Sequence, residues 1–120
     1  MDLLHAVTVS LLPVSRLKAA AVFHELRQTY GEVPLDLLAD ALRIPPEERR
    51  PMLAAAKDAA ESAVRGAAAN GIEPIACFDE RYPALLACTP DPPPVLWSRG
   101  NIDVLTRPAV AVIGSRAASP

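Results

Sequence analysis

The sequence predicts a mostly helical N-terminal region followed by the first strands of an α/β sheet. Over residues 1–70, apolar side chains recur at intervals of three or four residues, which is the period of an amphipathic helix. After residue 71, apolar residues gather in short β-branched runs bounded by prolines and glycines, which is typical of buried strands. We therefore divide the chain into a helical domain, residues 1–70, and the incomplete start of an α/β domain, residues 71–120.

Turn-forming residues mark the ends of the predicted helices. Ser15 has the side chain of a good N-cap for the second helix, and Gly31 ends that helix because glycine tolerates the left-handed conformation. Pro34 suits the first turn of a third helix. Pro45-Pro46 forces a break, so we expect Pro51 to open the longest helix, which closes near Asn70-Gly71.

Three predicted strands follow, over residues 72–78, 95–97 and 109–113, with a short helix around residues 82–87. The last strand runs directly into Gly114-Ser115-Arg116. A buried strand that ends in small residues is how the phosphate-binding turn of a Rossmann-type unit begins, because glycine lets backbone N–H groups approach an anion. The helix that should come next is not present before Pro120. We therefore expect an α/β domain that starts here and is not finished.

Composition restricts the function. Hydrophobic residues make up 51% of the chain, so a core can form, while the formal net charge is −2. Residues 1–70 carry 8 basic and 9 acidic side chains, and residues 71–120 carry 4 and 5. Neither half is basic, which argues against strong DNA binding on composition alone.

Metal, cofactor and membrane roles find no support in the sequence. Cys77 and Cys88 have no companions at metal-ligand spacing, so we expect two reduced and partly buried thiols and no metal or cofactor. The N-terminus lacks the basic region and cleavage motif of a secretory signal, and no stretch is apolar enough to cross a bilayer. A cytoplasmic protein is the expected result.

The order of motifs in the second region resembles the DprA/Smf family of DNA-processing proteins. The matching motifs are Gly71-Ile72, Asp79-Glu80-Arg81-Tyr82-Pro83 with Leu85 and Leu86, Asp91-Pro92-Pro93-Pro94-Val95-Leu96, Gly100-Asn101, and Ala111-Val112-Ile113-Gly114-Ser115-Arg116. Each motif is weak alone, but five in this order make a specific resemblance over residues 71–119. The resemblance implies an extended Rossmann-like fold that binds single-stranded DNA and helps to load a RecA-type recombinase in DNA recombination, competence and natural transformation. It also implies a homodimer that is not an enzyme.

The first region is similar in layout to the small helical domain, of helix-hairpin-helix or SAM-like type, that family members often carry. A DNA-binding hairpin has two glycines in its turn, and here the turn reads Pro13-Val14-Ser15-Arg16. This departure favours packing or protein contact by the helices. A helical protein-interaction or regulatory domain with no DNA binding of its own is therefore the alternative function.

Gly114, Ser115 and Arg116 are the predicted DNA- or phosphate-binding residues. The guanidinium of Arg116 can pair bidentately with a phosphate, while the amides of Gly114 and Ser115 complete the anion site. The competing interpretation is a structural arginine that pairs with a carboxylate. Trp97 is expected in the core rather than as a platform for stacking bases. No nucleophile, paired carboxylate or other catalytic arrangement is present, so we predict no catalytic residues.

Overall fold

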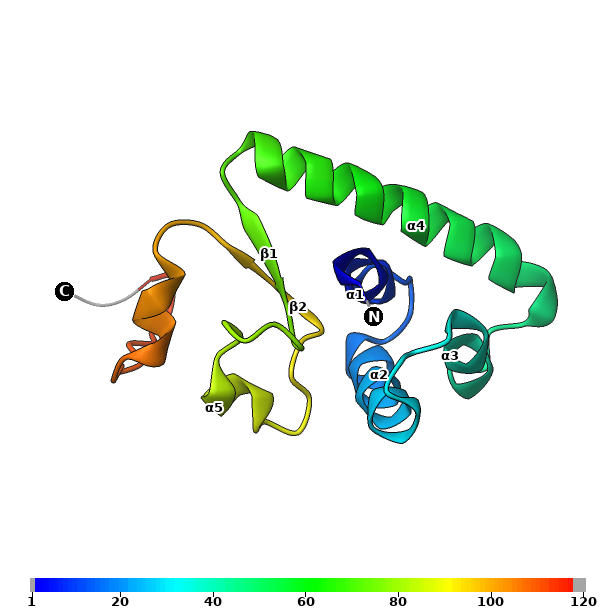
Figure 1. Cartoon of the computed structure of the whole chain (residues 1–120), viewed down its shortest axis with the longest axis horizontal. Helices are drawn as coiled ribbons and strands as arrows, with labels where there is room; N and C mark the ends of the chain where they lie inside the picture. Colours follow the sequence, from blue (N-terminus) through cyan, green and yellow to red (C-terminus); the bar gives the residue numbers. More distant parts are fainter. Residues whose placement is uncertain (1, 118–120) are drawn as a thin grey trace.

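The computed structural model describes residues 2–117 and is mostly helical, with one small antiparallel sheet. The elements in chain order are α1 (Leu3–Ser10), α2 (Arg16–Tyr30), α3 (Leu35–Ala41), α4 (Pro46–Ala69), β1 (Glu73–Ala76), α5 (Ala84–Ala87), β2 (Val95–Ser98) and the 3₁₀ helix η1 (Ile102–Thr106). Helix α4 lies across one side of the molecule, and α1 lies between α4, α2 and the two strands (Figure 1). Helix α3 packs against α2 near the beginning of α4 (Figure 1).

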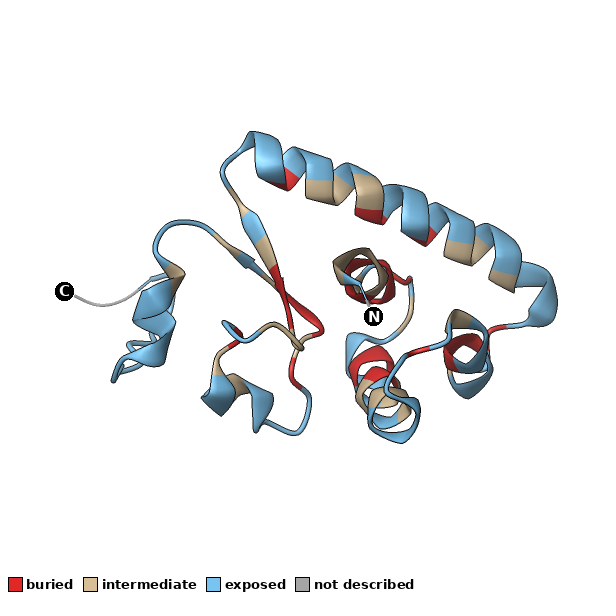
Figure 2. Ribbon diagram, viewed as in Figure 1, coloured by how far each residue is buried: buried red, intermediate tan, exposed pale blue. Residues whose placement is uncertain are grey.

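The core is centred on α1. Its fully buried residues Ala6, Val7 and Val9 form one cluster with Phe23 of α2 and Leu38 of α3. The same cluster includes Ala56 and Ala60 of α4 together with Ala76 of β1 and Val95 of β2. Small alanines let α4 approach α1 closely, and Figure 2 shows the buried residues on the inward side of each element. The division of the chain at residue 71 remains a prediction, and this core connects its two parts.

Helices α2 and α3 lie where the turn-forming residues predicted them, although Pro34 is the N-cap of α3 and precedes its first turn. Asp2 is the N-cap of α1, and its Oδ1 accepts a hydrogen bond of 2.8 Å from the N–H of His5. Gly31 ends α2 with φ of 72°, as predicted for a left-handed cap. Ser15 occupies the N-cap position of α2, but its side chain makes no capping hydrogen bond. The prediction that the Ser15 side chain caps this helix was therefore wrong.

The longest helix begins earlier than predicted. It starts at Pro46, and Pro51 lies inside it. Pro46 suits the first helical position because the N–H that proline lacks has no partner there. Glu47 and Glu48 in the first turn interact favourably with the positive end of the helix dipole, which offsets only part of the cost of the hydrogen bond that Pro51 cannot donate.

Strands β1 and β2 form an antiparallel pair in which Glu73 lies opposite Ser98 and Ala76 lies opposite Val95. Only one end of the pair is buried, so the prediction of fully buried strands was wrong for Glu73 and for Trp97. The prediction of a strand over residues 109–113 was also wrong, because this segment has no regular secondary structure and is exposed. A strand needs a neighbour for its backbone groups, and within residues 2–117 the sheet consists of β1 and β2. The Rossmann-like and helix-hairpin-helix or SAM-like assignments remain predictions.

Candidate functional site

The predicted phosphate-binding residues lie on an exposed segment. Gly114, Ser115 and Arg116 follow Val112 and Ile113, whose side chains are each 94% exposed. A Cβ atom on Gly114 would meet no other atom within 4 Å, so a ligand can reach the backbone here. Among the described residues, no hydrogen bond or salt bridge involves this segment or Arg116. The segment is accessible to an anion. Within residues 2–117, no helix N-terminus and no second arginine makes a hydrogen bond or salt bridge to it.

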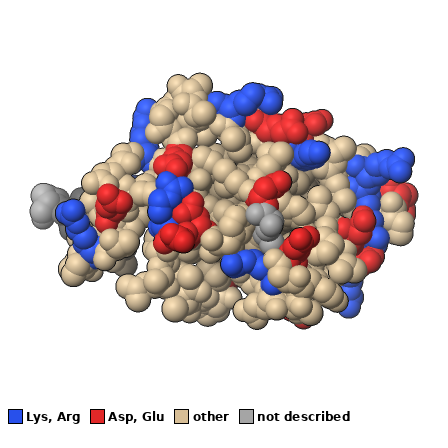
Figure 3. Space-filling model, in the orientation of Figure 1, with Lys and Arg blue, Asp and Glu red and all other residues tan. Residues whose placement is uncertain are grey.

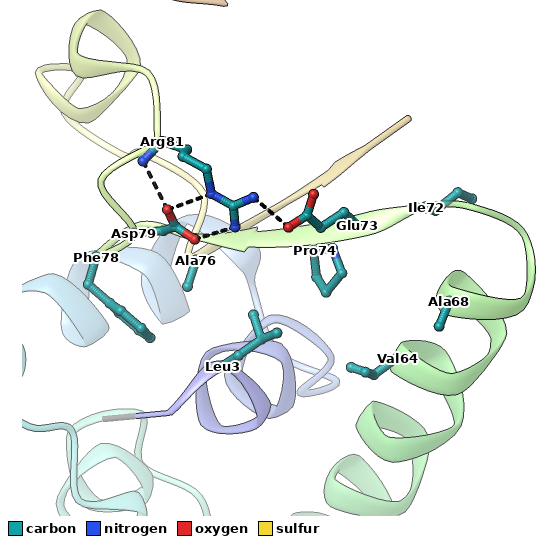
Figure 4. A pocket seen from close by; sticks show the side chains of 10 residues that line it. All are labelled: Leu3, Val64, Ala68, Ile72, Glu73, Pro74, Ala76, Phe78, Asp79 and Arg81. Atoms are coloured by element: carbon teal, nitrogen blue, oxygen red, sulfur yellow. Dashed lines mark hydrogen bonds and ion pairs between the residues drawn. The ribbon is translucent and has the colours of Figure 1, made fainter. Parts of the chain in front are cut away.

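The Asp79–Pro83 motif forms a turn held by arginine. Arg81 donates from Nε and Nη2 to the Asp79 carboxylate, at 3.0 and 2.7 Å, and from Nη1 to Glu73 at 2.5 Å. The backbone N–H of Arg81 also donates to Oδ1 of Asp79, at 2.9 Å. Figure 4 shows the guanidinium between the two carboxylates. The turn is thereby fixed by side chains that are close in sequence.

This ion-pair cluster shifts the proton affinity of its members. The hydrogen bonds from Arg81 lower the pKa of Asp79 to about 2, because they stabilise the carboxylate. Hydrogen bonds to Asp79 and Glu73 raise the pKa of Arg81 above its ordinary value. At neutral pH, Asp79 is therefore a charged acceptor and a poor acid for catalysis.

A hollow of about 460 Å³ lies beside this cluster. Its apolar side is formed by Leu3 of α1 with Val64 and Ala68 of α4, and the opposite side by the hairpin (Figure 4). Arg81 is the basic residue that lines this hollow, and its guanidinium already forms salt bridges with the carboxylates of Glu73 and Asp79. We therefore assign the cluster a structural role at the junction of α1, α4 and β1.

Three successive proline carbonyls accept hydrogen bonds from three parts of the chain. Nε2 of His24 donates to the Pro92 oxygen at 2.8 Å, Tyr82 Oη donates to Pro93 at 2.8 Å, and the Cys77 N–H donates to Pro94 at 2.9 Å. We call Pro92–Pro94 the proline clamp. It ties α2 to the hairpin, since His24 and Pro92 are 68 residues apart. Burial raises the pKa of Tyr82 to about 12, so the phenol remains a donor at neutral pH.

The two cysteines differ in environment. Cys77 is half-buried, and its Sγ accepts a weak contact of 3.8 Å from Nη1 of Arg27. Burial raises the pKa of Cys77, which disfavours the reactive thiolate. Cys88 is exposed, so the expectation of a partly buried thiol was wrong at that position. Cys88 directly follows the short surface helix α5, whose residues are not buried.

A second cavity, which the sequence did not predict, lies between the helices and β2. We call it the Trp97 groove; its volume is about 600 Å³. Its lining residues come from the α1–α2 connection, α2, the proline clamp and β2: Val9, Ser10, Leu11, Leu12, Arg16, Leu17, Ala19, Ala20, Asp91, Pro93, Pro94, Val95, Leu96 and Trp97. Trp97 is 43% exposed, so its predicted place in the core was wrong. Leu17, which also lines the groove, is an apolar side chain that is 64% exposed.

The surface charge is mixed. On the face in Figure 3, acidic and basic side chains alternate and form no extended basic area. Among residues 2–117 there is no cluster of three or more histidine, cysteine or acidic side chains that could hold a metal ion. In the same part of the chain, each helix is too short or too polar to span a bilayer.

The second part of the chain is similar to a known protein family. Residues 73–120 match the model of a family described as DNA recombination-mediator protein A. The matched segment includes the hairpin, the proline clamp and the predicted Gly114–Arg116 site. Searches of curated proteins and of solved structures gave no significant match.

Proposed function

We propose that this chain is a DprA/Smf-type DNA recombination mediator that binds single-stranded DNA through Gly114, Ser115 and Arg116, since residues 73–120 match the model of that family. In this proposal the chain helps to load a RecA-type recombinase during recombination and transformation, as a homodimer in the cytoplasm. It acts by binding, without catalysis or a cofactor. The observation that carries the proposal is an exposed Gly-Ser-Arg segment within the matched region.

The chemistry of these three residues suits a phosphate. A guanidinium offers a planar pair of donors that matches two phosphate oxygens, and such charge-assisted bonds are stronger than neutral ones. Arg116 has no salt-bridge partner among residues 2–117, so a phosphate would not have to displace a carboxylate. The open backbone at Gly114 gives the phosphate access to neighbouring amides.

The number of phosphate contacts sets the expected salt dependence, and the net charge of −2 indicates that this number is small. The chain as a whole does not attract a polyanion, so binding must come from a small number of phosphate contacts. Each neutralised phosphate on a single strand contributes a slope of about −0.7 in log affinity against log salt. We expect a slope near that of one or two contacts.

The test is fluorescence anisotropy of a labelled oligo-thymidine with this chain, at low and at moderate salt. Arg116→Ala should weaken binding by about tenfold or more, since a hydrogen bond to a charged group contributes roughly 1.5–3 kcal/mol. Arg50→Ala is the matched control, because Arg50 is exposed on α4 and its loss changes the net charge equally. An equal loss in both variants, or no binding at low salt, would contradict the proposed site. Recombinase filament assembly on the same oligonucleotide then tests loading.

A further inference from the structure

We propose that the Trp97 groove is a second contact for single-stranded DNA, in which one base stacks on Trp97 and its phosphate pairs with Arg16. This inference rests on the proposed function and extends it to a second site, which joins the helical region to residues 91–97. The groove is formed jointly by the helical region and by the family-matched region. Its volume of about 600 Å³ lies in the range of small-molecule sites and can hold a nucleotide.

Trp97 supplies the flat surface. It lies on β2 with 43% of its surface exposed, although the neighbouring Val95 on the same face of the strand is buried. An indole left partly open beside a cavity is a surface on which a base of any sequence can stack. The prolines of the clamp line the same groove, and their carbonyl bonds to His24, Tyr82 and Cys77 fix that wall.

Arg16 supplies the charge. It is exposed at the start of α2, lines the same groove as Trp97, and has no salt bridge among the described residues. A guanidinium near an indole complements the two parts of a nucleotide, a flat base and an anionic phosphate. Asp91 is the acidic residue of the lining and disfavours a second phosphate. The groove therefore fits one nucleotide of a strand.

A protein helix is the competing occupant, because Leu11 and Leu17 on the rim are apolar and exposed. An apolar helix would bury these leucines but would leave the Arg16 charge without a partner. The nucleotide satisfies both the indole and the guanidinium, so we favour it.

Trp97 is the single tryptophan of the chain, so intrinsic fluorescence reports on this groove directly. Unlabelled oligo-thymidine of about four nucleotides, close to the smallest single-strand sites, should quench the emission on titration. Arg16→Ala should weaken the binding measured by this quenching by about fivefold or more, and Arg50→Ala should leave it within about twofold. Trp97→Phe should weaken binding measured by anisotropy while circular dichroism confirms the fold.

The Arg116→Ala variant separates this inference from the proposed function. Quenching that persists in Arg116→Ala and is weakened in Arg16→Ala supports the groove as an independent contact. Anisotropy that depends on Arg116 without any Trp97 quenching would overturn the groove and leave the proposed function standing. Absence of both signals would overturn both. A change in Trp97 fluorescence with purified recombinase, but not with oligonucleotide, would overturn the nucleotide and assign the groove to a protein.

Discussion

The packed part of the molecule and the segment after β2 are both rich in apolar residues, yet they have opposite environments. Phe23 and Leu38 are fully buried, whereas Val110, Val112 and Ile113 are at least 90% exposed. The difference lies in what each structure requires. A helix satisfies its backbone hydrogen bonds internally and needs only a neighbour for its apolar face. A strand needs neighbours for its backbone as well, and residues 109–113 have none within the described chain.

The proline clamp shows how the packed part extends beyond the helices. His24 and Tyr82 donate to adjacent proline carbonyls that lie 68 and 11 residues further along the chain, and Tyr82 is itself buried. Proline cannot donate a backbone hydrogen bond, but its carbonyl remains a full acceptor. The clamp therefore orders a loop of poor secondary-structure propensity, while the segment after residue 107 has no comparable contacts among the described residues.

The largest expected effect of a substitution lies in the packed part. Phe23→Ala should lower the free energy of unfolding by about 3–5 kcal/mol, because it removes a fully buried ring from the centre of the core. Urea denaturation followed by circular dichroism measures this loss.

Val112→Ala is the control for that comparison. It removes an apolar side chain that touches little, so the change should stay within about 0.5 kcal/mol. A loss of several kcal/mol in Val112→Ala would show that residues 109–113 are packed in solution and would break the contrast.

The proline clamp should give an intermediate effect. Tyr82→Phe removes the hydrogen bond to the Pro93 carbonyl and should cost about 1 kcal/mol at neutral pH. Because burial raises the pKa of Tyr82 from 10.0 to about 12, its contribution is present below pH 10 and is lost as the pH rises toward 12.

Denaturation at neutral and at alkaline pH tests this interpretation of Tyr82. The stability of Tyr82→Phe should fall less steeply with rising pH than that of the unaltered chain. Tyr30→Phe is the matched control, since Tyr30 is 59% exposed. If the two variants had identical pH dependence, the phenol of Tyr82 would not be the group that couples ionisation to folding.

The Asp79 cluster should have a smaller effect on stability, because exposed ion pairs are screened by solvent. Its signature is the titration of Asp79. The carboxyl should titrate near pH 2 by NMR, and Arg81→Ala should move its pKa back toward 3.8. Since the pKa is lowered on folding, the stabilisation is present above pH 3.8 and is lost as the pH falls through 2. A titration unchanged in Arg81→Ala would contradict the assigned cause.

Several parts of the fold that depend on local signals were predicted from the sequence, although the side-chain cap at Ser15 was not formed. The left-handed cap at Gly31 and the helical period of α1–α3 follow from residues that are close in the chain. The start of α4 was misplaced, because Pro51 was treated as a helix start and is accommodated inside the helix. The environment of residues 109–113 depends on strand partners, which periodicity does not identify.

The candidate sites also differ in how far they depend on local sequence or on tertiary packing. The Gly114–Arg116 site was predicted from a strand-then-glycine pattern and from the family motif; it stays a prediction, and the strand of that pattern is not formed. The Trp97 groove was missed, because Arg16 and Trp97 are brought to one cavity only when α2 packs near β2. Likewise, no spacing rule connects His24 with Pro92, whose hydrogen bond spans 68 residues. Contacts of this kind come from tertiary packing.

The smallest expected change in stability comes from a substitution in the exposed residues 109–113. It tests whether the unpaired backbone of this segment promotes self-association. Val112→Lys should alter the free energy of unfolding by less than about 0.5 kcal/mol, yet it should reduce concentration-dependent self-association. An extended, unpaired apolar segment invites pairing with another chain, and a lysine disfavours it. Sedimentation velocity over a range of protein concentrations measures the association.

Leu85→Lys is the matched control, since Leu85 is 88% exposed on α5 and belongs to a short helix rather than to an open extended segment. An equal reduction in both variants would mean that exposed apolar area alone drives association. A reduction confined to Val112→Lys would assign it to the unpaired backbone of residues 109–113.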